Sequence, residues 1–511
     1  MEKRLKKCHG FVEKAYPVFF VLLTAWIAFL CFYRLGVKYV DPYDEAQHGI
    51  NAYEMLRQGK LFVNTYLYEK DYYNLKPPLS MWMLMGSFKL FGNTVFALRF
   101  FSGVCYVLTA VLTGLFARRY GRLESLLVLG FLSANTTPFA AHMIRSGDAD
   151  SLYVLLFTLA MLCMLKITEN QKNLYLCGLF FALAFLTKSY HAGVIVVIGG
   201  LFLILTGEIK KMNWKVWITF LLSAALPVVI WAAGRFCSDG TAFFKNMILT
   251  DVVGRSSEGF GSNEGPFTYY LQYFLGTMSK HTTVYLVAFV ICLVGCVAFN
   301  HLFTREHYRK VIGYVLWIMI PFLAFSAVST KLLWYLYPVL IPLLMVAGIL
   351  AARLIRWEGL IPAGRILVAL IITAVIINFS RGVYTTILEQ EGNSFQDFLA
   401  RTAAETADNI SEKNDMSGGN DMLNAYIVYG QNEAGEVAST WARQDVFLAE
   451  INGDLRCRQG GLEALEAEKD SAGPVVFYVE KTYYDKTKNN FRDAGFQMQE
   501  ESDGYVFLVK E

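Results

Sequence analysis

Charged residues are scarce in this chain of 511 residues, since Asp, Glu, Lys and Arg make up 17% of it, whereas soluble proteins carry roughly 25%. The shortage is uneven: residues 16–380 hold long apolar runs between short polar loops, and residues 381–511 have an ordinary soluble composition. That tail has 12 Lys+Arg and 24 Asp+Glu, a net charge of −12. Because the whole chain is +3, the remainder is +15, which indicates two environments along one chain.

Cysteine pairs and a continuous basic patch are also missing. The nine cysteines include no CxxC pair and no zinc-like Cys/His spacing, and most of them lie in apolar runs. We therefore interpret them as small buried residues, which excludes a disulfide framework or a metal cluster built on cysteine. The basic residues are dispersed through short loops, which argues against nucleic acid as a partner.

Long apolar runs, in contrast, are abundant, and a bilayer core needs about 20 apolar residues per helix. The first run follows a basic N-terminus and has no small-residue cleavage site after it, so it is expected to be a membrane helix and not a signal peptide. The sequence predicts a polytopic α-helical membrane protein with about 11 transmembrane helices. These lie near residues 16–36, 94–117, 122–141, 151–167, 173–187, 190–206, 214–234, 283–303, 311–329, 333–352 and 364–380.

The loop charges predict the orientation of these helices. Clusters of Lys and Arg lie in the N-terminal segment and in alternate loops, near residues 118–122, 210–215, 305–310 and 353–365. The intervening short loops hold the single cations Arg145, Lys188 and Lys331. By the positive-inside rule, the N-terminus is cytoplasmic and the tail is extracytoplasmic in a multi-pass plasma-membrane protein.

The chain is therefore expected to have a membrane domain at 1–380 and a small soluble α/β domain at 381–511. The tail shows helical patterns at 394–413 and 462–469 and strand-like runs at 426–429, 475–479 and 505–509. Within the long outer loop 37–93, residues 79–92 are apolar but too short to span, which favours an amphipathic helix in the membrane interface.

Two runs in this outer loop carry groups suited to chemistry. Asp44 and Glu45 begin a stretch with helical apolar spacing, so they are either catalytic carboxylates or caps favoured by the helix dipole. Lys76 precedes two prolines that fix an extended backbone. It is expected either to bind a lipid phosphate or to be an ordinary interfacial lysine.

Further polar groups lie at the ends of later spans. Arg145 and Asp150 either face a polar cavity or brace their loop as a pair. Lys188, near His191, and Lys331, with Tyr335, stand at other helix ends. Together these groups suit transfer from a lipid phosphate to a hydroxyl or amine, because one acid can act as general base while cations hold the leaving phosphate.

These motifs resemble those of GT-C glycosyltransferases of the protein O-mannosyltransferase and lipid A aminoarabinose transferase kind. The resemblance covers about residues 10–350. It is carried by residues 43–46 with 53–56, 76–79 with Trp82, Arg145 with Asp150, 186–188, and 331–338.

The resemblance implies an inverting transferase that takes a sugar from a polyprenyl-phosphate donor at the outer face of the membrane. Asp44 would be the general base and Glu45 its neighbour. The donor phosphate would be held by Lys76, with Lys331 and Tyr335 as weaker candidates and Lys188 beside them. Arg145 and Asp150 would shape the cavity. The acceptor is left open among envelope glycan, lipid and protein.

The sequence departs from the family pattern in three places. An acid that contacts a metal is expected before the lysine at 76, but Leu75 stands there, which argues against a divalent metal. Ser189 replaces the usual glycine after the 186–188 motif. The stretch 251–270, with Arg255 and Tyr269, resembles a flexible outer loop without its usual histidine, and it would be either a mobile lid or a solvated linker.

Two other functions compete with the transferase. A transporter or flippase of a lipid-linked or anionic substrate could use the same cations, although the matched halves typical of transporters are not visible. A structural membrane protein could use the acidic tail to recruit partners.

Overall fold

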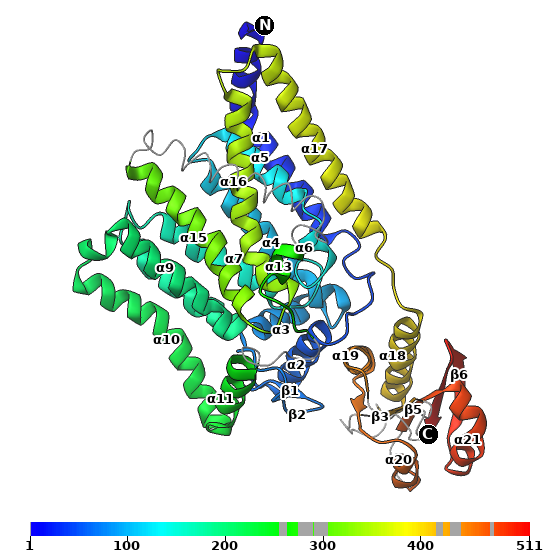
Figure 1. Ribbon diagram of the computed structural model, residues 1–511. Coiled ribbons are helices and arrows are strands. Elements are labelled where there is room, and N and C mark those ends of the chain that lie inside the picture. Colours follow the sequence, from blue (N-terminus) through cyan, green and yellow to red (C-terminus); the bar gives the residue numbers. More distant parts are fainter. Residues whose placement is uncertain are drawn as a thin grey trace. The chain divides into compact units, whose positions relative to one another are not determined.

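The computed structural model describes residues 2–254, 263–273, 290, 305–414, 423–429, 441–470 and 475–510, and Figure 1 shows their helices and strands. The chain divides into two compact units. Unit 1 comprises Met1–Leu35, Leu75–Ser80 and Arg99–Glu389. Unit 2 comprises Gly36–Asn74, Met81–Leu98 and Gln390–Glu511.

Unit 1 is helical. Its main helices are α1 (Glu2–Phe32), α4 (Val95–Ala117, which begins in unit 2), α5 (Arg122–Ser133), α7 (Asp150–Leu165), α8 (Asn173–Lys188), α9 (Gly193–Thr206), α10 (Trp214–Asp239), α15 (Arg305–Ala327), α16 (Tyr337–Arg356) and α17 (Pro362–Leu388). Shorter elements are α6 (Thr137–Ala140), η1 (Ser189–Ala192), η2 (Glu208–Lys211), α11 (Ala242–Asn246), η3 (Met247–Gly254), α13 (Tyr269–Gln272) and η6 (Leu333–Leu336).

Among the described residues, seven helical segments are long and apolar enough to cross a membrane. The expected multi-pass membrane fold is therefore confirmed. The predicted span at 122–141 is interrupted, because α5 ends at Ser133 and α6 is a separate turn that begins at Thr137. The predicted span at 283–303 lies outside the described residues apart from position 290. The count of eleven spans stays a prediction.

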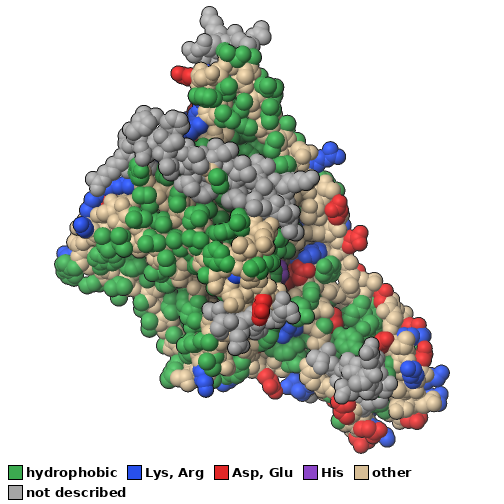
Figure 2. Space-filling model, viewed as in Figure 1, with side chains coloured by type: hydrophobic (Ala, Val, Ile, Leu, Met, Phe, Trp, Pro, Cys, Tyr) green, Lys and Arg blue, Asp and Glu red, His purple; other side chains and the backbone are tan. Residues whose placement is uncertain are grey.

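The apolar helices differ in how much protein surrounds them. In α16 and the η6 turn before it, 72% of the most apolar stretch is buried inside the protein, compared with 17% in α10 and 11% in α17. Figure 2 shows the apolar side chains that consequently cover much of the visible surface of unit 1. An apolar surface of this extent is typical of contact with lipid and not with water.

Ion pairs join the basic loops at one end of unit 1. Arg119, in the turn between α4 and α5, pairs with Glu169 in the turn between α7 and α8. Arg309, near the start of α15, pairs with Glu208 at 2.8 Å. Arg356, at the end of α16, pairs with Glu124 near the start of α5. The cation clusters predicted for one membrane side are thus held together by these acids.

Unit 2 combines residues 36–74 and 81–98, called the outer segment after the position predicted for them, with the tail around a five-stranded sheet. Its elements are α2 (Asp44–Gln58), β1 (Thr65–Tyr66), β2 (Glu69–Lys70), most of α3 (Leu79–Phe91), α18 (Ser394–Asn414), β3 (Asn424–Val428), α19 (Arg443–Gly453), β4 (Arg456–Cys457), α20 (Leu462–Ala467), β5 (Val475–Glu480), α21 (Lys481–Asp493), β6 (Gln497–Ser502) and β7 (Tyr505–Lys510).

The sheet of the tail has the strand order β4-β3-β5-β7-β6. Strand β3 pairs in parallel with β4 and β5, and β7 pairs antiparallel with β5 and β6. Successive residues of β5 point to opposite faces, so Val476 and Tyr478 enter one core while Val475, Phe477 and Val479 enter the other. The expected small α/β domain is confirmed.

One of these two cores extends into the outer segment. It contains Ile50 and Tyr53 of α2 and Met81, Leu84, Met85 and Phe88 of α3, together with Phe398 of α18 and Phe447 of α19. The boundary predicted at residue 380 separates the tail by composition, whereas the contacts in the structure group the tail with residues 36–74 and 81–98. Helix α2, which carries the two candidate acids, therefore packs on the tail.

The segment 79–92 forms a helix, α3, as the sequence predicts. One face of it, with Met81 and Phe88, is buried in the core of unit 2. The opposite side still exposes apolar side chains, since 71% of Leu90 is exposed. Contact of that side with the membrane interface stays a prediction.

Candidate active site

The two candidate acids occupy the first turn of α2 and have different surroundings. The backbone of Tyr43 has φ 70° and ψ −103°, and α2 begins at the next residue. Glu45 is fully buried, and its Oε2 accepts a hydrogen bond from the backbone nitrogen of Asp41 at 2.8 Å. Asp44 is only partly buried. Glu45 therefore holds the turn, and Asp44 is the acid that a substrate can reach more easily.

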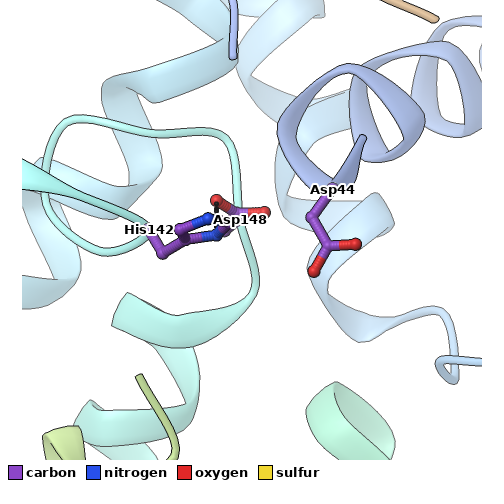
Figure 3. Close-up of side chains that lie close together, drawn as sticks. All are labelled: Asp44, His142 and Asp148. Atoms are coloured by element: carbon purple, nitrogen blue, oxygen red, sulfur yellow. Dashed lines mark ion pairs between the residues drawn. The ribbon is translucent and has the colours of Figure 1, made fainter. Parts of the chain in front are cut away.

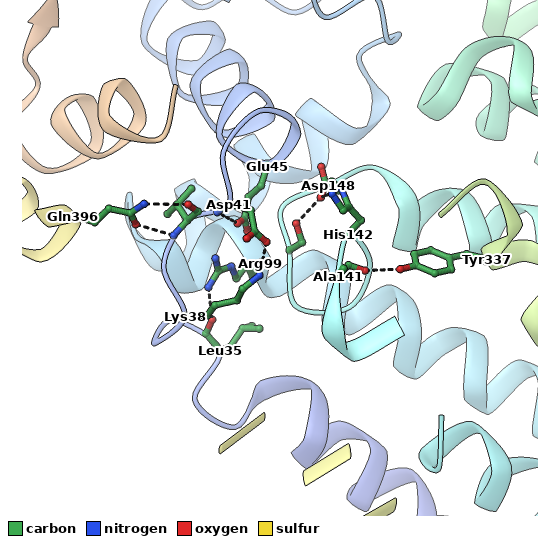
Figure 4. A network of polar contacts seen from close by, with 12 residues as sticks. Leu35, Lys38, Asp41, Glu45, Arg99, Ala141, His142, Asp148, Tyr337 and Gln396 are labelled. Atoms are coloured by element: carbon green, nitrogen blue, oxygen red, sulfur yellow. Dashed lines mark hydrogen bonds and ion pairs between the residues drawn. The ribbon is translucent and has the colours of Figure 1, made fainter. Parts of the chain in front are cut away.

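The segment before α2 is anchored to the tail within unit 2. The side chain of Gln396 on α18 makes two hydrogen bonds with the backbone of Val40, 2.8 Å from its nitrogen and 3.1 Å from its oxygen. Lys38 pairs with Asp41 just before the acids (Figure 4). The tail thus helps to fix where α2 begins.

A buried polar network holds the rest of the outer segment to α2. Asp71 accepts hydrogen bonds from Gln47 at 2.6 Å and Asn51 at 2.9 Å, both on α2. Asn51 in turn accepts one from Asn74 at 2.7 Å. Because buried polar groups need partners, this network specifies one path for the chain that leads to Lys76.

Lys76 belongs to the short piece of unit 1 that follows this network. Its side chain is partly exposed, while Pro77 and Pro78 behind it are buried. The neighbouring Leu75 is 3% exposed and offers no metal ligand at the position where the family resemblance places an acid.

The structure brings Asp150, Lys188 and Tyr335 together inside unit 1. The Nζ of Lys188 lies 2.5 Å from Oδ1 of Asp150, and both side chains are buried. The same ammonium lies 5.6 Å from the ring centroid of Tyr335 and 5.9 Å from that of Tyr153, within reach of a cation–π interaction. His191 contacts the Tyr335 ring at 4.6 Å. Lys188 is thus already neutralised by a protein carboxylate.

Lys331 is placed differently from this cluster. It is 4% exposed, and its ammonium donates hydrogen bonds to the backbone oxygens of Ser326, at 2.7 Å, and Val328 at the end of α15. Cations stabilise helix C-termini, so Lys331 caps α15. Burial lowers its pKa below the ordinary lysine value.

Arg145 and Arg99 hold the end of α1. The guanidinium of Arg145 donates to the backbone oxygens of Tyr33 and Arg34, both at 2.8 Å, and Arg99 donates to that of Leu35 at 3.2 Å. Burial, with the nearby charge of Arg99, lowers the pKa of Arg145 to about 10, so the group stays charged at neutral pH. The guanidinium thus binds backbone carbonyl groups, while Asp150 pairs with Lys188.

One polar pair was missed by sequence reasoning. Nδ1 of His142 lies 3.1 Å from Oδ2 of Asp148 (Figure 3), and the imidazole stacks on Trp334 with 3.7 Å between ring centroids. Ser146 also donates to Asp148 at 2.6 Å. Asp148 lies between the candidates Arg145 and Asp150, but nothing in the spacing connects it to a histidine six residues earlier and a distant tryptophan.

In the described part of the 251–270 loop, residues near its end are hydrogen-bonded to the backbone at positions 331 and 332. The backbone oxygen of Asn263 accepts from the nitrogen of Lys331 at 2.7 Å, and Tyr270 donates to the oxygen of Leu332 at 2.9 Å. Tyr269 stacks edgewise on Tyr270 at 5.2 Å. Arg255 lies outside the described residues. Whether residues of this loop open and close as a lid stays a prediction.

The candidate residues are divided between the two units. Asp44 and Glu45 belong to unit 2, whereas the remaining described candidates, Lys76, Arg145, Asp150, Lys188, Tyr269, Lys331 and Tyr335, belong to unit 1. Their convergence on one donor stays a prediction.

Comparisons with known proteins found a family model, curated relatives and solved structures that are similar to this chain. The family model described as dolichyl-phosphate-mannose-protein mannosyltransferase matches residues 75–231. An undecaprenyl phosphate-alpha-4-amino-4-deoxy-L-arabinose arabinosyl transferase of Shewanella sediminis is 28% identical over 388 residues, 72% of this chain and 65% of the relative. An uncharacterized Aquifex aeolicus protein is 24% identical over 62% of this chain and 61% of its own length. The chain thus spans slightly under two thirds of these relatives.

Solved structures show the fold more completely. The crystal structure of ArnT from Cupriavidus metallidurans bound to undecaprenyl phosphate has a TM-score of 0.69 with 15% identity, covering 96% of this chain and 97% of that one. The oligosaccharyltransferase AglB from Archaeoglobus fulgidus has a TM-score of 0.52 with 10% identity, over 90% of this chain and 69% of that one. The GT-C fold expected from the sequence is confirmed.

Proposed function

We propose that this protein transfers a sugar from a polyprenyl-phosphate donor to an acceptor of the cell envelope, with inversion at the anomeric carbon. The observation that carries the proposal is the likeness in fold to a structure bound to undecaprenyl phosphate, over 96% of this chain. The named curated relatives are transferases of an undecaprenyl-phosphate-linked sugar, which agrees with it. None of them supports the transporter alternative.

Asp44 is the proposed general base. It is a partly exposed carboxylate in the first turn of α2, a position that the helix dipole favours for an acid, and Glu45 beside it already holds the turn. As the acceptor oxygen or nitrogen attacks the anomeric carbon, its proton passes to Asp44. The bond from that carbon to the phosphate oxygen breaks with its electron pair, and the polyprenyl phosphate leaves.

The cations of unit 1 are the proposed stabilisers of the departing phosphate. Lys76 is the first candidate, because it is partly exposed and held by rigid neighbouring prolines. Lys188 and Tyr335 form a second group, in which the phosphate would share the ammonium with Asp150. Lys331 and Arg145 bind backbone carbonyl groups, so we assign them positioning roles.

The proposed orientation places the N-terminus in the cytoplasm and the tail outside. The ion-paired basic loops at one end of unit 1 support it, since clustered Lys and Arg stay on the cytoplasmic side. The proposal includes no metal ion, because Leu75 is buried and apolar where an acid would bind one.

A transfer assay with purified protein in detergent tests this function. Donors with different sugars on undecaprenyl phosphate, including 4-amino-4-deoxyarabinose, are offered together with envelope extract, and labelled product is measured. Asp44→Asn should lower transfer by at least about a hundredfold, because no carboxylate then accepts the proton. Activity should survive EDTA.

The matched control is Glu69→Gln, which removes an exposed acid of the same outer segment and should leave transfer unchanged. Normal transfer by Asp44→Asn would remove that residue from the catalytic role. Activity that needs sealed vesicles and vanishes in detergent would favour a transporter instead.

A further inference from the structure

A hollow of about 370 Å³ lies on unit 1, far along the helices from the candidate active site. It is formed by α1 near Tyr16 together with the end of α4 and the start of α5. Arg145, a candidate of the active site, binds the backbone of Arg34 just beyond the end of α1. Tyr16 lies 18 positions before Arg34 in the chain. At 1.5 Å per residue that separation is about 27 Å, so the hollow is a separate site.

The floor of the hollow is fixed by a buried tyrosine. Tyr16 is 5% exposed, and its hydroxyl lies 3.0 Å from Oγ of Ser125. The guanidinium groups of Arg118 and Arg122 lie over its ring, 5.3 Å and 5.8 Å from the centroid. The ring thus holds two cations at one end of the hollow.

The charges around this end do not cancel. Glu13 is the acid of the lining, and it pairs with Arg122 at 3.2 Å. Lys14 and Arg118 are exposed, and neither has an ion pair with a carboxylate in the part of the chain that the structure describes. One end of the hollow therefore carries an excess of positive charge.

The opposite wall is apolar and open. It is made by Pro17, Phe20, Val21 and Leu115, and 64% of Val21 and 46% of Leu115 are exposed. A soluble anion could use the cations but would leave this wall uncovered. An amphiphile with an anionic head and a hydrocarbon chain satisfies both ends, because the chain covers apolar surface while the head binds the cations.

We infer that this hollow binds one anionic phospholipid from the membrane leaflet on the side where α1 begins. Its phosphodiester lies against Arg118, Arg122 and Lys14, and an acyl chain lies along Phe20 and Leu115. Because the hollow joins α1 to α4 and α5, the bound lipid holds these three helices together.

Lipid binding to the purified full chain tests this inference. The protein in neutral detergent is titrated with dioleoyl phosphatidylglycerol, dioleoyl phosphatidylcholine or glycerol phosphate, and bound molecules are counted by native mass spectrometry. Phosphatidylglycerol should bind first and with a stoichiometry of one. The double variant Lys14→Gln, Arg118→Gln should weaken that binding at least about tenfold, because each surface cation contributes to anionic-lipid affinity.

The matched control is Lys215→Gln, an exposed cation at the start of α10 outside the hollow, which should bind as the unmodified chain does. Arg118→Lys should retain most of the binding, which separates lost charge from lost folding. Equal binding of phosphatidylcholine, equal binding of glycerol phosphate, or unchanged binding by the double variant would each overturn the inference.

Discussion

Single buried charges in this protein are secured by specific partners. Lys188 has Asp150, while Arg145 and Lys331 each have several backbone oxygens. An isolated charge in such surroundings would be very costly, so these partners are needed for the helices to pack at all. The sequence could indicate that these cations matter, because charges at membrane helix ends are rare, but it could not indicate which oxygens each one would take.

Removing one member of the buried pair should be costly. Lys188→Met leaves Asp150 without its cation, and we expect a loss of about 3–5 kcal/mol of stability, measured as a lower thermal midpoint in detergent. The double variant Lys188→Met, Asp150→Asn should recover part of this loss, because no charge is then buried alone. Lys172→Met, which removes an exposed lysine just before α8, serves as the control, and an equal effect there would contradict the reasoning.

A second buried pair, of two acids, links α2 to α19 inside unit 2. Glu54 and Glu450 are both fully buried. Burial raises the pKa of Glu54 to about 7 and raises that of Glu450 well above its ordinary value, with the charge of Glu54 as a second cause for Glu450. At least one of the two is therefore protonated in mildly acidic solution.

The sign of the resulting pH dependence follows from these raised values. The folded state binds the proton more tightly than the unfolded one, so stability is fully present below the ordinary glutamate pKa and is lost as pH rises toward 7 and above. Glu54→Gln should weaken this dependence and stabilise unit 2 at pH 8, by at most about 3 kcal/mol.

Hydrogen exchange of α19 peptides, corrected for the intrinsic pH dependence of amide exchange, measures this effect. The variant Glu466→Gln removes an exposed acid of the same domain and should change nothing. If Glu54→Gln kept the pH dependence of the unmodified protein, the buried pair would not be its source.

At the scale of elements, the long apolar runs and the alternating strands could be predicted because hydropathy directly records burial. Helices α4, α16 and α17 and strands β3, β5 and β7 fall close to their predicted positions, whereas α1 begins well before the predicted residue 16, at Glu2. The helices α19 and α21 and the short strands β4 and β6 were missed. The two helices have polar faces, and the place of the two strands in the sheet depends on neighbours distant in sequence. The packing of α2 on α19 also depends on residues distant in sequence.

The approach of α2 to α19 depends on one glycine. A Cβ at Gly49 would lie 2.6 Å from Cε2 of Phe447, closer than side-chain atoms tolerate. Gly49→Ala should therefore force the helices apart and destabilise unit 2 by about 1–3 kcal/mol. It should also lower transfer by displacing Asp44, which lies on the same helix.

Thermal unfolding and the transfer assay together check this substitution. Gly199→Ala provides a matched change, because that glycine lies within α9 and a Cβ there would have no neighbour within 4 Å. We expect it to be neutral or slightly stabilising. Comparable behaviour of the two variants would show that the close contact at Gly49 is not limiting.

At the scale of the whole molecule, unit 2 is built from three separate segments of the chain. Two of them, residues 36–74 and 81–98, precede most of unit 1 in the sequence, and the third is the tail. Composition predicts the membrane helices and the soluble tail, but it cannot predict that the outer segment shares a core with the tail. That core is built from side chains more than 300 positions apart, such as Ile50 and Phe447.

Deleting residues 390–511 should therefore abolish transfer and not merely remove an accessory module. The deletion exposes the buried faces of α2 and α3, so residues 36–74 should become sensitive to protease while the membrane helices remain inserted. Limited proteolysis of the truncated protein, with gel filtration to confirm its state, measures both effects. Full transfer by the truncated chain would show that α2 keeps its structure alone.

The shared core also sets an order of events during synthesis. Helix α2 emerges from the ribosome long before Phe447 and the sheet that complete its core, so a long interval of synthesis separates them. For most of that time α2, which carries the candidate base Asp44, lacks the tail residues of its core. Its apolar side chains are then uncovered. Until those segments have been made, the core that positions α2 is incomplete and its apolar side chains are open to chaperones and proteases.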